Sequence, residues 1–243
     1  MFELVNEDCL LTMKSIKRNS VDLIFCDLPY GQTKEKWDTP LSLEKLWNEY
    51  YGCLKSNGAI VLFGQEPFSS TLRMSNLSDY KYDWYWEKER MTNVMQVKKR
   101  AGKTIETISV FYKQQPTFNP QMTLYSGPPR KNKVKDGSLG NLIDSSKNSV
   151  REYVDNGLRY PTQLLKFKRD ILTSNLHSTQ KPLALCEYIV KTYTNENDLV
   201  LDNCMGSGTT GVACKKLNRQ FIGIEKDSIS FKVASERIDR NHD

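Results

Sequence analysis

The stretch LVLDNCMGSGTTG, residues 199–211, carries the clearest structural signal in the sequence. It has the pattern of a short apolar strand, a glycine-rich turn and the start of a helix, with the spacing Gly206-x-Gly208-x-x-Gly211. Such a turn lets the backbone approach a nucleoside-containing ligand closely. Glu225 ends the next strand pattern and is placed to accept hydrogen bonds from two ribose hydroxyls. We therefore expect a nucleoside cofactor at this turn, and a purely structural turn is the weaker alternative.

Outward from this turn, strand and helix patterns alternate along the 243 residues. Strand patterns occupy residues 2–6, 21–27, 59–64, 81–88, 105–113, 198–204 and 220–225. Helical patterns occupy residues 9–16, 43–54, 183–193, 209–217 and 228–238, with a further helix beginning near Pro67. Continuous apolar runs such as VDLIFCD (21–27) are typical of parallel strands buried on both faces. The sequence therefore predicts an α/β fold with a doubly wound, mostly parallel sheet.

The pattern is interrupted between about residues 114 and 176. Within this segment, SGPPRKNKVKDGSLGN (126–141) is rich in turn-forming and basic residues and has little apolar periodicity. No linker rich in Pro, Ser or Gly separates two apolar cores, and the length suffices for one large domain. We expect a single domain over residues 1–243 that carries an irregular surface insertion at 117–175.

The positive charge is concentrated in the middle of the chain. The net charge is +6, and residues 81–181 hold 19 Lys and Arg against nine Asp and Glu. This distribution suits a phosphate-rich partner on one face, although a solvated lysine-rich surface explains it equally well. No run of about 18 apolar residues predicts a membrane span, and the N-terminus lacks the pattern of a secretory leader. We expect a cytoplasmic protein without a membrane partner.

The six cysteines are scattered singly, and the sequence contains only two histidines. None of the cysteines forms a C-x-x-C pair, so the spacing of a zinc finger is missing. We expect buried, reduced thiols and no metal site.

Asp202, an acid at the end of the strand before the glycine-rich turn, helps to distinguish between nucleoside cofactors. It places negative charge beside the turn, which disfavours a pyrophosphate and favours the ammonium and sulfonium groups of S-adenosylmethionine. The peptide dipoles at the helix start still favour anions, so a nicotinamide-dependent oxidoreductase stays open as an alternative.

Three motifs together resemble one enzyme family. DLPYG (27–31) resembles the D/N/S-P-P-Y motif of amino-directed DNA methyltransferases, and DNCMGSGTTG (202–211) resembles their cofactor motif. HSTQKP (177–182) resembles the H-P-T-x-K-P segment that precedes the cofactor motif in the permuted, β-type subgroup. The order of the motifs is that of the subgroup, and the resemblance covers nearly the whole chain except about 120–160. It implies a sheet of the S-adenosylmethionine-dependent methyltransferase type, in a bacterial or phage-encoded protein.

The resemblance implies a catalytic loop of Asp27, Leu28, Pro29 and Tyr30. An exocyclic amine is a poor nucleophile because its lone pair is delocalised into the ring. Two acceptors, the Asp27 carboxylate and the Leu28 carbonyl, would hold its two N–H bonds and turn the lone pair toward the methyl group. Leucine replaces the usual proline, but this role uses no side chain. Tyr30 would stack on the base after it leaves the duplex, recovering about 1–3 kcal/mol of the unstacking cost.

The resemblance also implies a set of cofactor-binding residues. These are Asp8, Cys9, Asp27, Ser178, Thr179, Lys181, Asp202, Gly206, Ser207, Gly208 and Glu225. Asp8 and the Cys9 backbone are expected at the adenine, Glu225 at the ribose, and the others at the methionine part. Ser178 stands where proline is usual, and Asp8 in EDCL has the alternative of simply capping a helix.

Double-stranded DNA is the implied partner, and basic runs in the middle of the chain are candidates for its phosphates. The candidates are Lys98, Lys99, Arg100, Lys103, Arg130, Lys131, Lys133, Lys166, Lys168 and Arg169. The insertion at 117–175 is the candidate target-recognition region. A homodimer and a separate restriction endonuclease are further partners that the resemblance allows.

Methylation at cytosine C5 needs a cysteine nucleophile, usually in a Pro-Cys pair, and no such pair occurs. Between the two amine targets, aspartate at position 27 resembles adenine-N6 enzymes, whereas serine is more typical of cytosine-N4 enzymes. Related motifs occur in enzymes that methylate RNA or protein glutamine, but the permuted order and basic middle region favour DNA. A nucleic-acid-binding protein without catalysis is the remaining alternative, disfavoured by the intact Asp27, Tyr30 and glycine turn.

Overall fold

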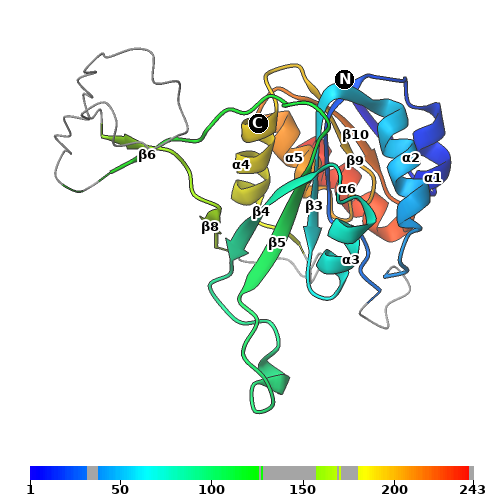
Figure 1. Ribbon diagram of the computed structural model, residues 1–243. Coiled ribbons are helices and arrows are strands. Elements are labelled where there is room, and N and C mark those ends of the chain that lie inside the picture. The colour runs from blue at the N-terminus through cyan, green and yellow to red at the C-terminus, as the bar shows by residue number, and fades with distance from the viewer. Residues whose placement is uncertain (32–37, 126, 128–156, 169, 171–179, 241–243) are drawn as a thin grey trace. The chain divides into compact units, whose positions relative to one another are not determined.

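Parallel strands form most of the main sheet in the computed structural model, which describes residues 1–31, 38–125, 127, 157–168, 170 and 180–240. In this part of the chain the strand order is β1-β10-β9-β2-β3-β5-β4-β8 (Figure 1). The bounds are β1 Phe2–Val5, β2 Val21–Cys26, β3 Leu54–Gly64, β4 Tyr80–Glu87, β5 Ile105–Phe111, β8 Leu164–Lys166, β9 Leu199–Asp202 and β10 Gln220–Ile224. All neighbours from β1 to β3 pair in parallel, β5 is antiparallel to β3 and β4, and β8 is parallel to β4.

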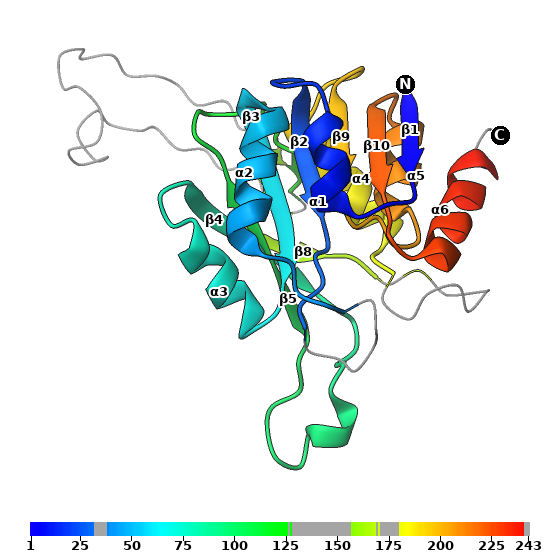
Figure 2. The same cartoon turned by 90° about the vertical axis from the view of Figure 1, so that its right-hand side faces the viewer.

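Helices cover both faces of this sheet. They are α1 Cys9–Thr12, α2 Leu43–Cys53, α3 Phe68–Ser75, α4 Leu183–Tyr193, α5 Thr209–Lys216 and α6 Ser228–Arg240. Figure 2 shows α1 and α2 in front of the sheet and α4 and α5 behind it. Along β2, Leu23 and Phe25 join the core cluster of α4, α5 and α6, whereas Ile24 and Cys26 join that of α1, α2 and α3. Because successive side chains point to opposite faces, a strand buried on both faces is apolar throughout. The doubly wound α/β fold expected from the sequence is confirmed.

Two elements differ from the sequence pattern. β3 begins at Leu54 rather than near Ala59, because Leu54 pairs with Val21 ahead of an irregularity in the register. The helical pattern over 9–16 divides into α1 and a 3₁₀-helix, η1 (Met13–Ser15). In β3 the strand pairing overrides the local signal of the turn-forming residues before Gly58.

The chain divides into two compact units, one made of residues 1–119 with 162–243 and the other of residues 120–161. In the second unit, β6 (Thr123–Leu124) pairs antiparallel with β7 (Leu158–Arg159) among the described residues. The insertion expected at 117–175 is wider than this unit, since β8 belongs to the main sheet.

All six cysteines lie within the described residues and are free thiols, and all but Cys204 are buried. Among the helices that the structure describes, none is both long and apolar enough to cross a membrane.

Candidate active site

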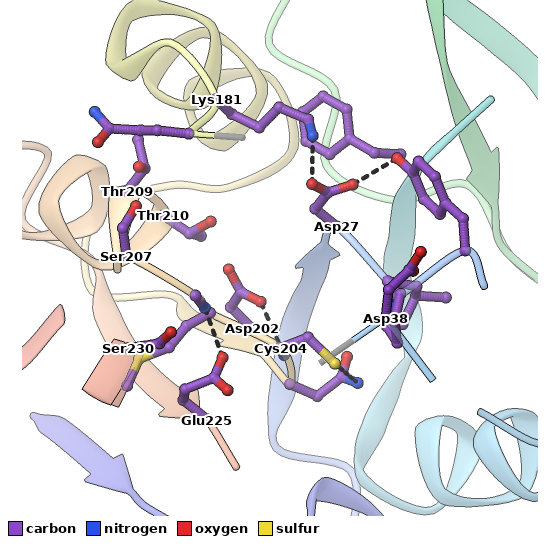
Figure 3. A pocket seen from close by; sticks show the side chains of 18 of the residues that line it. Asp27, Asp38, Lys181, Asp202, Cys204, Ser207, Thr209, Thr210, Glu225 and Ser230 are labelled. Atoms are coloured by element: carbon purple, nitrogen blue, oxygen red, sulfur yellow. Dashed lines mark hydrogen bonds and ion pairs between the residues drawn. The ribbon is translucent and has the colours of Figure 1, made fainter. Parts of the chain in front are cut away.

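The carboxyl ends of the parallel strands meet at one edge of the sheet, and acidic residues gather there. Asp8 follows β1, Asp27 follows β2, Asp202 ends β9 and Glu225 follows β10. They border a cavity of about 1440 Å³, which exceeds the roughly 300–1,000 Å³ of a typical small-molecule site. Figure 3 shows Asp27, Asp202, Glu225 and Lys181 around it. The cavity therefore has room for a cofactor and a second ligand group.

Most of the expected site residues in the described chain line this cavity. They are Asp8, Cys9, Asp27, Leu28, Pro29, Tyr30, Lys181, Asp202, Gly206, Ser207 and Glu225. Ser178 and Thr179 lie outside the described residues. The sequence motifs thus meet in space although they are up to about 200 positions apart in the chain.

Asp27 is held by two partners. The Tyr30 hydroxyl donates a hydrogen bond to Oδ1 over 2.5 Å, and the Lys181 ammonium pairs with Oδ2 (Figure 3). Lys181 comes from the segment just before α4, so the expected cofactor ligand pairs with the expected catalytic acid. Burial lowers the pKa of Lys181, but the attraction of Asp27 and Glu106 outweighs it, so the pKa of this ammonium lies well above its usual value.

Tyr30 is fixed by its ring as well as by its hydroxyl. The ring stacks on Phe68 at the start of α3, with centroids 4.9 Å apart and planes inclined by 25°. Burial and the nearby carboxylates of Asp27 and Glu106 raise the pKa of Tyr30 well above its usual value. The hydroxyl is therefore protonated and acts as the donor to Asp27.

The loop after Tyr30 is held by Gly31 and by a residue that the sequence analysis missed, Asp38. Gly31 has φ +67°, and a Cβ there would clash with Pro40, so only glycine fits. Its N–H donates to Asp38 Oδ1 over 2.8 Å. Asp38 is buried and also borders the cavity. No motif in the sequence pointed to it.

A polar cluster next to Asp27 was also missed. Glu106 of β5 accepts hydrogen bonds at Oε1 from Lys88 Nζ (2.5 Å) and Gln65 Nε2 (2.7 Å). Its other oxygen, Oε2, lies 3.7 Å from Lys181 Nζ. Burial raises the pKa of Glu106, but the positive charges of Lys181 and Lys88 lower it by more than burial raises it. The pKa of Glu106 therefore lies below its usual value. All of these side chains border the cavity.

On the cofactor side, Asp202 is the most buried acid, with 4% of its surface exposed. One oxygen accepts from the Cys204 backbone N–H over 3.2 Å (Figure 3). Burial raises the pKa of Asp202 to about 7. A cationic ligand beside this carboxylate would favour its charged form, whereas an anionic ligand would not.

The two expected cofactor glycines have different surroundings. Gly206 has φ +49°, and a Cβ there would meet nothing within 4 Å. Gly208 has φ +75°, and a Cβ there would lie 3.0 Å from Ala234 Cβ of α6. Of these two described residues only Gly206 borders the cavity. Gly206 thus leaves open space at the cavity, and Gly208 lets α5 and α6 pack closely.

Glu225 and Asp8 are fixed by backbone groups. Glu225 Oε2 accepts from the Gly206 N–H over 2.9 Å, and its Oε1 accepts from the Asp227 N–H over 2.8 Å. Asp8 Oδ1 caps α1 by accepting from the Leu10 N–H over 3.0 Å. Its Oδ2 pairs with Lys226 over 3.0 Å, a contact that lowers the pKa of Asp8. Asp8 therefore caps a helix and borders the cavity at the same time.

These surroundings fit S-adenosylmethionine. Asp27 and Asp202 offer negative charge to an ammonium and a sulfonium, and Gly206 leaves open space at the turn. The pyrophosphate of a nicotinamide dinucleotide would meet the same carboxylates at a cost.

The basic residues expected at DNA lie in several places. Residues 88–104 link β4 to β5 and include the 3₁₀-helix η2 (Val94–Gln96), and Figures 1 and 2 show this link projecting beyond the ends of the two strands. Met91 and Thr92 of the link line the cavity. Lys98, Lys99 and Arg100 are exposed on this link, and Lys103 is half-buried. Lys168 is exposed, and Lys166 is exposed and paired with Glu87 over 3.0 Å. The others lie outside the described residues, namely Arg130, Lys131, Lys133 and Arg169.

Comparisons with known proteins agree on one family. A family model described as DNA methylase, of the N6 and N4 type, matches residues 21–236. The DNA adenine methyltransferase YhdJ of Escherichia coli (strain K12) is 32% identical, over 97% of this chain and 82% of that protein. The type II methyltransferase M.HpaI of Haemophilus parainfluenzae is 27% identical, over 97% and 74%.

Two solved structures extend these comparisons. The M1.HpyAVI–SAM complex is similar with a TM-score of 0.64 and 28% identity, covering 98% of this chain and 99% of that one. The cytosine-N4-specific PvuII DNA methyltransferase has a TM-score of 0.66, covering 100% of this chain and 88% of that one. At 16% identity the second likeness shows the fold alone.

Proposed function

The chain belongs to the N6/N4 family of DNA methylases, and from this premise we propose that it transfers a methyl group from S-adenosylmethionine to the N6 amine of adenine in double-stranded DNA. One observation carries the proposal: the Asp27 carboxylate of the DLPYG loop borders the same cavity as Asp202, Gly206 and Glu225. A proposed acceptor for an amine and a proposed binding surface for a cationic nucleoside cofactor thus share one cavity.

When bound, S-adenosylmethionine supplies an electrophilic methyl group. Glu225 would accept hydrogen bonds from its ribose, Asp202 would hold its ammonium, and Gly206 and Ser207 would border the methionine part. Asp8 and Cys9 would lie at its adenine. Lys181, Ser178 and Thr179 are also proposed as cofactor-binding residues. Lys181 in addition contacts Asp27 of the catalytic loop.

The catalytic loop acts by alignment. The Asp27 carboxylate and the Leu28 carbonyl would each accept one N–H of the target amine, which turns its lone pair out of conjugation with the ring. The negative charge of Asp27 would also stabilise the positive charge that develops on the amine. Tyr30, fixed by Phe68 and Asp27, would stack on the flipped base, and Pro29 would restrict the backbone between them.

Adenine is the proposed target for two reasons. Position 27 is aspartate, and a relative of 32% identity over 97% of the chain is named as a DNA adenine methyltransferase. The cytosine-N4-specific PvuII enzyme is similar in fold alone, at 16% identity, and does not favour the alternative.

The proposed DNA contacts lie beside the cavity and on the insertion. Lys98, Lys99, Arg100 and Lys103 extend from the cavity edge, where they would reach phosphates flanking a flipped base. Lys166, Lys168, Arg130, Lys131, Lys133 and Arg169 are proposed for the same role. We propose one methyltransferase domain over residues 1–243, with target recognition in 117–175. Assembly into a homodimer and pairing with a separate restriction endonuclease remain predictions from the sequence.

Nucleoside mass spectrometry tests the proposal. Duplex DNA of mixed sequence is incubated with the protein and S-adenosylmethionine, digested and examined for methylated bases. N6-methyladenine supports the proposal. N4-methylcytosine moves the target to the other amine, and methylation of RNA but not DNA overturns the substrate.

A further inference from the structure

Both carboxylate oxygens of Asp27 already have partners. Tyr30 donates to Oδ1 over 2.5 Å, and the Lys181 ammonium pairs with Oδ2. Each oxygen can accept a second hydrogen bond, but the Lys181 ammonium competes with an amine N–H for the same carboxylate and holds positive charge close to where the amine would bind. Tyr30 is fixed on its ring by Phe68, with centroids 4.9 Å apart. Lys181 has a flexible side chain, so it is the partner that can move.

A second carboxylate, that of Glu106, lies close to the Lys181 ammonium. Glu106 is 6% exposed, and its Oε1 is occupied by Lys88 (2.5 Å) and Gln65 (2.7 Å). Its Oε2 is buried and has no hydrogen-bond partner among the described residues, yet it lies 3.7 Å from Lys181 Nζ. A buried carboxylate oxygen without a hydrogen bond is unfavourable and rare in folded proteins. This oxygen is therefore available to receive a donor.

We propose that Glu106 is a positioning residue for methyl transfer, which takes the Lys181 ammonium from Asp27 when the target amine enters. This inference rests on the proposed function. Lys181 moves between two carboxylates, and its proton stays on Nζ throughout. The Asp27 oxygen that it leaves becomes the acceptor for an N–H of the base.

The electrostatics favour the same movement. Positive charge develops on the amine during transfer, and an ammonium held on Asp27 would repel it. On Glu106, Lys181 keeps a full counter-charge, whereas a buried ammonium without one is strongly disfavoured. The Lys181 ammonium also lies 4.7 Å from the centre of the Phe63 ring, a surface over which it stays stabilised as it moves. Glu106 thus acts on the reaction through Lys181.

The test compares Glu106→Gln with a matched control, Asp83→Asn. Asp83 is also a buried acid, on the neighbouring strand β4, paired with Arg73 (3.3 Å) and Ser109 (2.6 Å), and it does not border the cavity. Each substitution removes one buried charge without changing shape. The measurements are the melting temperature, the Kd for S-adenosylmethionine, the Kd for plasmid DNA, and the single-turnover rate with methyl-labelled cofactor.

For Glu106→Gln we expect the single-turnover rate to fall roughly 10- to 100-fold, the scale of a misaligned reacting group. Both Kd values should change less than about threefold, and Asp83→Asn should keep the wild-type rate. In a Lys181→Met background, adding Glu106→Gln should have little further effect, because the two residues act as one unit. A wild-type rate in Glu106→Gln, or the same loss in both backgrounds, overturns the proposal.

A second variant covers the outcome in which Glu106→Gln does not fold. Glu106→Asp keeps the charge beside Lys88 but withdraws the carboxylate from Lys181 by one methylene. A rate below that of wild type supports the proposal, and an unchanged rate overturns it. If the wild-type protein itself transfers no methyl group, the proposed function fails and this inference falls with it, a result distinct from an active Glu106→Gln.

Discussion

The hydroxyl of Tyr30 donates a hydrogen bond to the carboxylate of Asp27, with the two oxygens 2.5 Å apart. The two residues stand three positions apart in the loop that follows β2, and Phe68 supports the tyrosine ring from the other side. The contact orients the carboxylate and the aromatic ring together, so the proposed acceptor and the proposed stacking surface for a base are held in one arrangement.

Two substitutions separate these roles of Tyr30. Tyr30→Ala removes the ring, so we expect methyl transfer to fall by roughly 10- to 100-fold, corresponding to about 1–3 kcal/mol of base stacking. Tyr30→Phe keeps the ring and loses only the hydrogen bond to Asp27, so its loss should be smaller. Steady-state kinetics on DNA checks the order. A larger loss in Tyr30→Phe than in Tyr30→Ala would contradict the stacking role.

Substitution of the two glycines of the turn, Gly206 and Gly208, is expected to cause different defects. A Cβ at either strains the backbone by about 1–2 kcal/mol, because both have positive φ. Gly206→Ala also fills cavity space, so it should weaken cofactor binding about tenfold or more. Gly208→Ala crowds Ala234 of α6, so it should mainly lower the melting temperature, by about 2–4 °C for each kcal/mol. Calorimetry and thermal unfolding on both variants check this; equal Kd values would contradict the assignment of Gly206.

The raised pKa of Asp202 predicts a pH-dependent cofactor affinity. Below its pKa of about 7 the carboxyl is largely protonated, and a cationic ligand must drive off the proton in order to pair with the carboxylate. The Kd for S-adenosylmethionine should therefore fall as pH rises from 5.5 to 7, by at most about tenfold per pH unit. Titration calorimetry should show proton release over this range. Asp202→Asn should bind weakly with a flat profile, and the same slope in this variant would rule out Asp202 as the source.

The same group has the opposite effect on the free protein. Because the folded pKa of Asp202 is raised above its ordinary value of about 3.8, its contribution to the free energy of unfolding is fully present below that value. It is lost as pH rises through about 7. Cofactor affinity and the stability of the free protein thus respond to pH in opposite directions at this residue.

The basic link between β4 and β5 predicts salt-dependent binding. Each of Lys98→Ala, Lys99→Ala and Arg100→Ala should weaken DNA binding and reduce the slope of log K against log salt by about 0.9, if it removes one phosphate contact. Lys17→Ala is the control, because Lys17 is exposed before β2, at the amino end of the strands and away from the cavity. Binding of plasmid DNA at several salt concentrations measures the slope. Equal slopes in all four variants would show that DNA binds to a surface other than this link.

Sequence reasoning located the acids that end parallel strands. Asp27, Asp202 and Glu225 each follow an apolar run, and parallel strands bring their carboxyl ends to one edge of a sheet, so their meeting was predictable. The apolar run of β2 likewise indicated burial on both faces. The sequence allowed two interpretations of Asp8, as a helix cap or as a cofactor ligand. In the structure Asp8 caps α1 and also borders the cavity.

Sequence reasoning missed Glu106, Lys88 and Gln65. They meet because β5 runs antiparallel to β3 and β4, which returns the start of β5 to the edge where those strands end. Nothing local in the sequence fixes that pairing, and an acid in an aromatic, β-branched run looks like an exposed residue. Gly208 was expected beside the cofactor because of its spacing, but packing against α6 accounts for its lack of a side chain.

The catalytic role of Asp27 is tested by comparing wild-type protein with Asp27→Ala, with cofactor affinity and methyl transfer measured in the same preparations. We expect both proteins to bind S-adenosylmethionine with Kd values within about tenfold, since one contact among several is removed. Only the wild type should produce N6-methyladenine in duplex DNA, because the amine loses its acceptor in the variant. Methyl transfer by Asp27→Ala at the wild-type rate would contradict the account.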